Sequence, residues 1–494
     1  MIRNGACQIL FAPPYFGSNG RRGNERLTMS NSDTYSLFTR RRFLRWSQGV
    51  MAAIGAFPLL GDATEAFGAP TPTAKASALP DYYDRLGVKE IINAYDTITD
   101  YTASIMPAEV QHAVAQAAKK HVLLKELQTA AGKYIADKLH CEAALVSCGA
   151  SSALSLATAA CVQAANNCKP TDIPQDIGGK FPKNEVIVQK AHRYEYEHAM
   201  YIAGIKIVEV SSLEDYKNAF TPNTVMTNFL NKFGIIYKDQ TIPHQEWIDI
   251  AHQHNVPCHC DAAADVPPID NLWKFTGMGY DLVCFSGGKG IRGPQNAGLL
   301  LGKKKYIDLA AANNNPGVGI GRGMKVAKEQ LVGMVAAVDW ILAQTDEGLD
   351  REDTRKANVI ISMVKNIPTM KSSIMIPPAE NQVPHLILTY DPAVVGVTPR
   401  EVSARLRTDT PRIFLNEYTG AARNNQGLPE ATNSLIVEMW MLQPGHEVIV
   451  GRQIHKVLTN PKSVGQYTPR APGAGAGRGA GAAPPPPSPQ GAGR

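Results

Sequence analysis

Short apolar runs that end in turn residues recur between helical segments, and this alternation constrains the fold more than any other feature. Helical patterns lie between the runs, for example from Pro107 to Ala118 and from Lys125 to Leu139. Strands that alternate with helices usually pair in parallel, with helices over both faces of the sheet. The sequence therefore predicts an α/β fold with a mostly parallel sheet, in which ligands bind beyond the carboxyl ends of the strands. The expected strands are Glu142–Cys148, Glu185–Gln189, Lys206–Val210, Val256–Cys260 and Leu282–Phe285.

One lysine follows the last of these runs within a group of glycines. In Asp281–Gly302, DLVCFSGGKGIRGPQNAGLLLG, Lys289 lies between two apolar runs. Glycines without a Cβ let a ligand approach the backbone closely. The lysine is therefore either a solvated loop residue or the partner of a carbonyl cofactor in a Schiff base. The segment lacks the GxxxxGK[ST] order of a nucleotide-binding loop, which excludes that function.

Further polar groups follow other predicted strands. Gly149-Ala150-Ser151-Ser152 opens a helix and is either a tight turn or an anion site suited to a phosphate. His192 is either a loop histidine or a flat ring that stacks on a cofactor. Asp261 either caps a helix or holds a protonated pyridine nitrogen. With Lys289 and the Ser286 hydroxyl, these residues supply a partner for each part of pyridoxal phosphate.

The C-terminal half predicts a smaller α+β domain. A long helix at Lys325–Leu342 is expected to run away from the sheet and lead into it. The expected boundaries are a large domain at 81–330 and a small domain at 331–462. Residues 466–494 are rich in Ala, Gly and Pro, which cannot build a core, so a disordered tail is expected. The small domain's expected elements are strands near His385–Tyr390, Arg412–Leu415 and Ser434–Glu438 and a helix at Pro444–Leu458.

The N-terminal region, residues 1–68, has the pattern of a twin-arginine export signal. Arg40-Arg41-Arg42-Phe43-Leu44 precedes the mildly apolar Gly49–Leu60, and Ala66-Phe67-Gly68 supplies the small residues of a cleavage site. The apolar segment is too short for a stable membrane anchor. We therefore expect the export machinery as a partner and a periplasmic or extracellular location, with Met29 as a possible start. The alternative is a basic start of a cytosolic protein.

Charge and cysteine usage exclude other classes of protein. The formal net charge is +6, but basic residues gather at the two ends of the chain, so no nucleic acid is expected. Cys258-His259-Cys260 resembles half of a metal site. However, alternation along a strand places His259 on the face opposite both cysteines, and no second ligand pair is spaced to complete the site. We therefore expect no metal and no disulfide scaffold.

Seven segments of this chain resemble the selenocysteine synthase-like family of fold-type-I pyridoxal-phosphate enzymes, which is similar to aminotransferase class V. That group includes enzymes similar to D-glucosaminate-6-phosphate ammonia-lyase. The likeness covers residues 82–335 well and extends loosely to about Leu458. It implies a homodimer or a larger assembly. The segments are INAYDTIT, SIMPAEV, ELQTAAGKYIADKL, EAALVSCGASSAL, HCDAAAD, DLVCFSGGKGIRGPQNAGLLLGKK and IGRGMKVAKEQLVG.

The resemblance also implies roles for individual residues. Lys289 corresponds to the Schiff-base lysine, Asp261 to the pyridinium contact and His192 to the residue that stacks on the ring. Arg322 corresponds to an arginine near the active site, which serves its own subunit or its neighbour. Arg412 and Arg423 are weaker candidates for binding a substrate carboxylate, because Trp440 stands where related chains often have an arginine. Phosphate binding falls to Gly149, Ala150, Ser151 and Ser286.

The expected reaction starts from loss of a proton at Cα. Lys289 would act as the base on a small amino acid or amino sugar, and an ammonia-lyase-like elimination would follow. Racemisation and transamination start from the same carbanion. The alternatives are selenium transfer to a charged tRNA and a non-catalytic exported binding protein. Selenium transfer is disfavoured because an export signal stands where selenocysteine synthases have a basic tRNA-binding module.

Overall fold

The computed structural model of the chain describes residues 81–418 and 434–464. The export signal, Met29, Arg423 and the Ala/Gly/Pro-rich tail lie outside these residues. Within the described ranges, no helix has both the length and the apolar character needed to cross a membrane.

The larger sheet has seven strands in the order β2-β8-β7-β6-β5-β3-β4. β8 is antiparallel to both of its neighbours, β2 and β7, and every other pair in the sheet is parallel. This arrangement agrees with the mostly parallel sheet that the sequence predicts. The strands are β2 (Ala143–Ser147), β3 (Glu185–Gln189), β4 (Lys206–Val210), β5 (Thr224–Leu230), β6 (Cys258–Asp261), β7 (Leu282–Ser286) and β8 (Gly298–Gly302).

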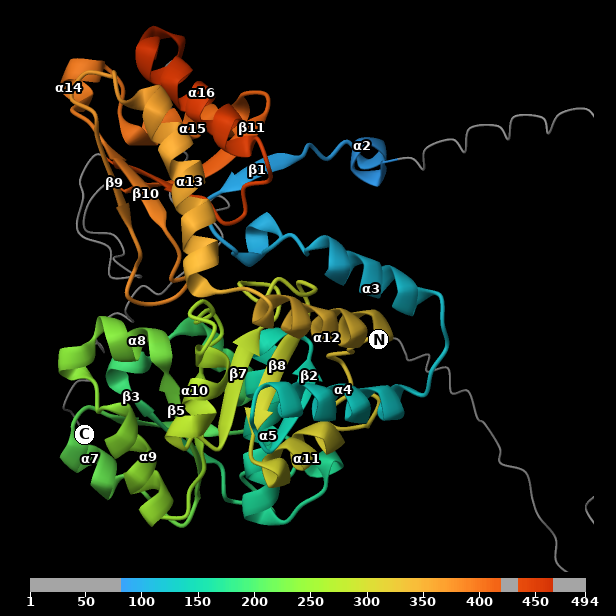
Figure 1. Ribbon diagram of the computed structural model, residues 1–494. Helices are drawn as coiled ribbons and strands as arrows, with labels where there is room; N and C mark the ends of the chain where they lie inside the picture. The colour runs from blue at the N-terminus through green and yellow to red at the C-terminus, as the bar shows by residue number, and fades with distance from the viewer. Residues whose placement is uncertain (1–80, 419–433, 465–494) are drawn as a thin grey trace, which may run out of the picture. The chain divides into compact units, whose positions relative to one another are not determined.

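Helices cover both faces of this sheet (Figure 1). On one face, α5 (Gly149–Asn166) packs with α6 (His198–Tyr201) and α11 (Lys304–Asn313). The small side chains of α5, mostly Ala and Ser, let its backbone come close to the strands. The other face carries α3 (Ala108–Ala118), α4 (Leu124–Lys138), α7 (Leu213–Asn218), α9 (His244–Gln253), α10 (Asn271–Met278) and α12 (Lys328–Leu342).

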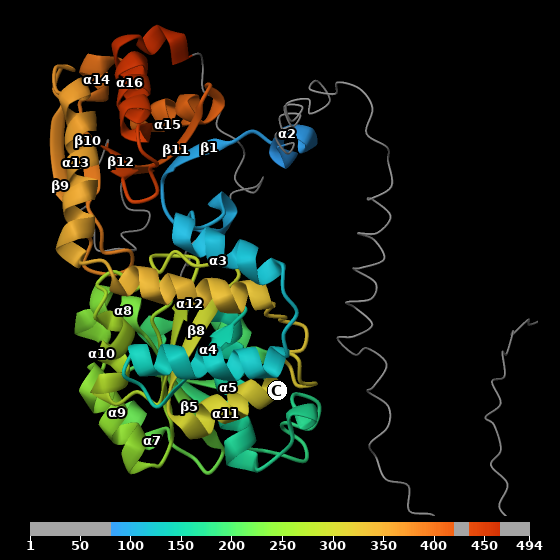
Figure 2. The ribbon, with the colours of Figure 1, turned by 45° about the vertical axis from the view of Figure 1, so that its right-hand side comes forward.

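The second sheet has five strands in the order β1-β11-β12-β10-β9. α13, α15 and α16 contribute buried residues to its separate core. The blue strand β1 joins the orange and red strands in Figures 1 and 2. Its elements are β1 (Ile91–Ala94), α13 (Asp346–Val364), β9 (Lys371–Met375), β10 (His385–Thr389), α14 (Pro392–Val395), α15 (Pro399–Thr408), β11 (Arg412–Tyr418), β12 (Ser434–Glu438) and α16 (His446–Thr459); α2 (Tyr82–Leu86) precedes β1.

Two expectations about the domain boundary were wrong. The helix expected to leave the sheet is α12. It packs on the larger core instead, because its apolar side chains Leu331, Met334 and Val338 are buried there. β1 was expected in the large domain, but it pairs in parallel with β11 in the second sheet. Residues 91–94 therefore belong with the C-terminal strands, and α13 is the helix that enters the second core.

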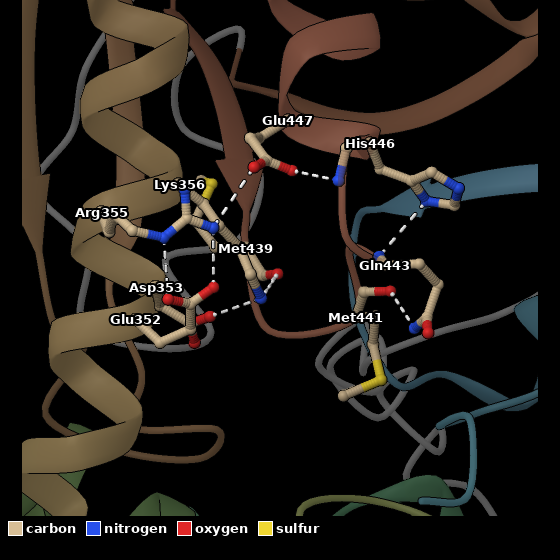
Figure 3. A network of polar contacts seen from close by, with 10 residues as sticks. Glu352, Asp353, Arg355, Lys356, Met439, Met441, Gln443, His446 and Glu447 are labelled. Atoms are coloured by element: carbon tan, nitrogen blue, oxygen red, sulfur yellow. Dashed lines mark hydrogen bonds and ion pairs between the residues drawn. The ribbon is translucent and has the colours of Figure 1, made fainter. Parts of the chain in front are cut away.

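A polar network fixes the segment that follows β12 (Figure 3). Arg355 on α13 donates to Glu352 and, at 3.2 Å, to Glu447 on α16. The buried Lys356 donates to Asp353 at 3.1 Å and to the carbonyl of Met439 at 3.2 Å. Buried charges of this kind are stable only when they are paired. The pairing holds the end of β12, and with it Glu438, against α13.

Candidate functional site

Residues from four strands meet at the carboxyl edge of the larger sheet. Gly298 of β8 pairs with Ser147 of β2 on one side and with Ser286 of β7 on the other. Asp261, the last residue of β6, pairs with Cys284 of β7. The sheet therefore brings the start of α5, the turn with Lys289 and Asp261 to one edge, as the strand order in the sequence predicts.

The lysine turn is fixed from two sides. Gly288 accepts a hydrogen bond from the backbone of Ser104 at 2.9 Å. A Cβ on Gly290 would lie 1.9 Å from the carbonyl oxygen of Val266, so glycine is needed here for a close backbone approach. Lys289 between them is half-buried. The turn that carries Lys289 is therefore held in place from both sides.

Asp261 is a buried carboxylate with few partners. Its Oδ2 accepts a hydrogen bond from the phenol of Tyr194 at 2.5 Å, and its Oδ1 accepts one from the backbone of Ala263 at 3.1 Å. Burial raises the pKa of Asp261, and the Tyr194 hydrogen bond and the charge of Lys289 lower it in part. A cationic N–H placed beside this carboxylate would offset the cost of its burial.

The turn at the start of α5 presents backbone N–H groups next to open space. Gly149 has a φ of +80°, and a Cβ placed on it would meet nothing within 4 Å. The Ser152 hydroxyl is buried without a hydrogen-bond partner. Free N–H groups and the helix dipole favour an anion at this position, and an unpaired buried hydroxyl favours an acceptor. Ser151 is exposed and Ser286 is half-buried.

Gly298→Ala is expected to weaken binding of pyridoxal phosphate by about tenfold or more and to lower stability by about 1–3 kcal/mol. The new Cβ would lie 2.5 Å from the backbone carbon of Gly149 and 2.8 Å from the nitrogen of Ala150, so the start of α5 must move. Cofactor titration and thermal unfolding measure the two effects. Gly277→Ala on α10 is the control, because nothing lies within 4 Å of its Cβ. Equal cofactor affinity in both variants would contradict this prediction.

His192 lies further inside the protein than the sequence suggests. Its ring is 0% exposed and packs edge-on against Phe229, with ring centroids 4.6 Å apart. The Nε2 atom contacts the Thr241 hydroxyl at 3.1 Å, and Nδ1 accepts from the backbone of Leu230 at 3.3 Å. Burial lowers the pKa of His192 to about 3, so the ring is neutral. The stacking role of His192 stays a prediction, and the burial of its ring does not favour it.

The candidate arginines are engaged elsewhere. Arg322 is exposed, and its Nη1 donates to Asn315 at 2.9 Å in the loop before α12. The Nε of Arg412 donates to the carbonyl of Arg407 at 3.1 Å, and its guanidinium lies over the Phe414 ring. The structure does not bring either residue to Lys289. Their roles in substrate binding stay predictions.

Three polar residues near Lys289 were not identified from the sequence: Tyr194, Asp96 and Asp265. Tyr194 is the residue that donates to Asp261. Asp96 follows β1, and the positive charge of Lys289 lowers its pKa, while burial raises it more. The same two causes act on Asp265, whose Oδ1 is buried without a partner. The only signal in the sequence was an acidic or phenolic residue just after an expected strand.

Asp265→Asn is expected to stabilise the cofactor-free protein increasingly as the pH rises from 5 to 8. Burial raises the pKa of Asp265 from 3.8 to about 7. Between these two values the folded protein holds a proton that the unfolded chain has released, so the free energy of unfolding falls as the pH rises. The variant lacks this loss, and its Tm should exceed that of the wild type by about 2 °C or more at pH 8. The exposed Asp239→Asn is the control, and a pH-independent Tm difference would contradict the prediction.

The cysteines and histidines do not form the arrangement that Cys258-His259-Cys260 suggested. Cys258 and Cys260 belong to one core, while His259 lies on the other face and contacts Asn228 at 2.7 Å. All seven cysteines in the described ranges are free. Donor atoms of His252, Cys258 and Asp281 do lie within 4.8 Å of one another, at the opposite end of β6. There Asp281 accepts from His252 and from the backbone of Cys258, which accounts for the grouping.

Pyridoxal phosphate fits the residues at the carboxyl edge. A phosphate matches the open turn at Gly149 and the unpaired hydroxyl of Ser152. A protonated ring nitrogen matches the buried Asp261, and an aldehyde matches the half-buried amine of Lys289. These groups lie at the ends of β2, β7 and β6, at one edge of the sheet, with β8 between β2 and β7.

Comparison with known proteins gives one family model and relatives over most of the chain. The SelA model, L-seryl-tRNA selenium transferase, matches residues 91–349. A 5'-C-glycyluridine monooxygenase-decarboxylase from a Streptomyces species is 27% identical over 68% of this chain and 84% of that protein. A D-glucosaminate-6-phosphate ammonia lyase from Salmonella typhimurium is 24% identical over 69% of this chain and 90% of that protein.

A solved structure of D-glucosaminate-6-phosphate ammonia-lyase has the same fold. It superposes with a TM-score of 0.65 at 22% identity, over 77% of this chain and 98% of that chain. This likeness confirms the predicted fold of a large domain with a mostly parallel sheet and a smaller α+β domain.

Proposed function

Because the chain belongs to the SelA (L-seryl-tRNA selenium transferase) family, we propose that it removes the proton from the amine-bearing carbon of a small amino acid or amino sugar. It is a pyridoxal-phosphate enzyme, as the sequence predicts. The observation that carries the proposal is the position of Lys289, in a turn fixed by Ser104 and Val266 at the same sheet edge as Asp261. We propose lyase-type elimination as the outcome.

Each residue at the edge has a defined task in this proposal. Pyridoxal phosphate supplies an electron sink for the charge that proton loss leaves on carbon. Asp261, oriented by Tyr194, holds the proton on the ring nitrogen, and the start of α5 with Ser286 binds the phosphate. The Lys289 amine takes the proton from the substrate carbon and can return it to a neighbouring atom. The glycines around Lys289 let the turn pack closely against neighbouring backbone, which fixes the position from which the lysine side chain extends.

Elimination is supported by the relative that is named as an ammonia lyase over 90% of its length. The family model itself is named for a selenium transferase, so transfer to a charged tRNA is the second candidate. Export through the twin-arginine pathway, which the N-terminal sequence supports, would separate the enzyme from charged tRNA. We therefore propose a periplasmic or extracellular enzyme, assembled as a homodimer or larger oligomer.

The test uses purified protein without residues 1–68, supplied with pyridoxal phosphate. The protein should develop a visible absorbance band and should exchange a carbon-bound proton of at least one amine for deuterium in deuterated water. Release of ammonia would then separate elimination from racemisation and transamination. A protein that binds the cofactor yet exchanges no proton across amines and amino sugars would support a non-catalytic role. A protein that does not bind it would end the proposal.

A further inference from the structure

Carboxyl groups gather on the side of Lys289 that faces the second sheet. The acid cluster consists of Asp96, Asp265, Glu380 and the amide of Asn381. Asp96 follows β1, Asp265 follows β6, and the other two precede β10. Three separate parts of the chain therefore contribute to one polar group, which neither sheet forms alone.

Backbone and side-chain contacts connect this cluster to the lysine turn. Asn381 donates from its amide Nδ2 to Asp96 at 2.6 Å, and its backbone donates to the carbonyl of Ala264 at 2.8 Å, next to Asp265. The Val266 carbonyl, on the other side of Asp265, lies against Gly290 beside Lys289. Burial raises the pKa of both Asp96 and Asp265, and the nearby charge of Lys289 lowers each in part.

Two acceptors in the cluster have no partner. The Asn381 Oδ1 and the Asp265 Oδ1 are buried without hydrogen bonds, and the two residues are 2% and 3% exposed. Buried polar atoms are normally satisfied, so two unpaired acceptors in the acid cluster indicate a missing donor. The Glu380 side chain is 22% exposed, so this member of the cluster is in contact with solvent.

Carboxyl groups outnumber lysines in this part of the described structure. The described residues around the lysine include the carboxyls of Asp96, Asp261, Asp265 and Glu380, and Glu380 forms an ion pair with Lys232 at 2.6 Å. Burial of Glu438 raises its pKa to about 7, and the charge of Asp96 contributes to the rise. Carboxyls that already repel one another favour donors and disfavour a further carboxylate.

We infer that the substrate carries hydroxyl groups next to its reacting amine and no carboxylate there, which is the chemistry of an amino sugar. The hydroxyls donate to Asp96 and to the unpaired oxygens of Asn381 and Asp265. This inference rests on the proposed function and narrows its substrate from amino acids and amino sugars to amino sugars. A substrate with a second amine in place of the hydroxyls would also donate hydrogen bonds to these oxygens. The experiment below distinguishes a diamine from an amino sugar.

The experiment measures shifts of the cofactor absorbance band during titration with matched pairs of amines. Serinol is paired with serine, D-glucosamine with D-glucosaminate, and putrescine with ornithine. In each pair the second compound carries a carboxylate that the first lacks. We expect half-saturation by serinol and glucosamine at concentrations at least about tenfold lower than by their carboxylate partners, which corresponds to about 1.4 kcal/mol. A stronger response to putrescine than to serinol would assign the cluster to a second amine and overturn the amino-sugar assignment.

Asp96→Asn tests the assignment to the acid cluster. The tenfold preference should fall to about threefold or less, because the variant keeps the shape of the side chain and loses its charge. Asp100→Asn is the control, since Asp100 is exposed in the same segment. If Asp96→Asn does not fold, Glu380→Gln serves in its place.

Besides a stronger response to putrescine than to serinol, three outcomes would overturn the inference. These are tighter binding of the carboxylate partners, an unchanged preference in the variants, and a band that no compound shifts. A protein without a cofactor band would instead refute the proposed function.

Discussion

Lys289→Ala is expected to abolish the visible cofactor band and to lower proton exchange by at least about 10³-fold, the scale of a lost general base. Lys289 is the half-buried amine at the sheet edge, and both the attachment of the cofactor aldehyde and the removal of the substrate proton depend on it. Spectra and exchange rates in deuterated water, recorded at saturating cofactor, measure the two losses separately.

The control for this variant is Lys217→Ala, because Lys217 is an exposed lysine on α7. It should retain both the band and the exchange rate of the wild type. Alanine at position 289 removes a half-buried side chain and leaves Gly288 and Gly290 in place, so the unfolding temperature should change little. A Lys289→Ala protein that keeps a visible band with the wild-type intensity would show that another lysine holds the cofactor.

Asp261→Asn is expected to lower proton exchange by about 10²–10³-fold while cofactor binding changes by about tenfold or less. Asparagine keeps the size of the side chain and lacks the negative charge that holds a proton on a ring nitrogen. Burial strengthens the effect of this charge on the ring nitrogen, because little water is present to screen the interaction. Cofactor titration and exchange rates together distinguish the two roles.

Tyr194→Phe is a milder test of the role of Asp261, because it removes one hydrogen bond to the carboxylate and leaves the carboxylate in place. Loss of the phenol removes a hydrogen bond that lowers the pKa of Asp261, so that pKa should rise and the pH at which exchange begins should rise with it. The exposed Asp308→Asn on α11 is the control for charge removal. Wild-type exchange in Asp261→Asn would refute the role of this carboxylate.

Several strands could be predicted closely because short apolar runs mark them in the sequence. β3 and β4 of the larger sheet and β12 of the second sheet have the bounds that these runs indicate. Once the strands were predicted, the residues at their ends could be predicted too. Lys289, Asp261 and the turn at Gly149 lie at one edge of the sheet. Local pattern was sufficient here because parallel strands place their ends together.

Other features could not be predicted because they depend on pairing between distant parts of the chain. β9, with the sequence KSSIM, is exposed or half-buried throughout and has no apolar run to reveal it. The proximity of Asp96 to Lys289 requires β1 to join the second sheet. His192 was expected to stack on a cofactor ring; the structure packs its buried ring edge-on against Phe229, and the stacking role stays a prediction.

The pairing of β1 with β11 has a consequence for the order of synthesis. Ile91 pairs with Arg412, so β1, the first strand in the described ranges, leaves the ribosome long before its partner β11 is made. The seven-stranded sheet needs only residues 143–302 and can form earlier. In a nascent chain, the turn with Lys289 would therefore form before the pairing of β1 with β11 brings Asp96 next to it. Selection for donor-rich ligands would then be the last property that the newly made protein acquires.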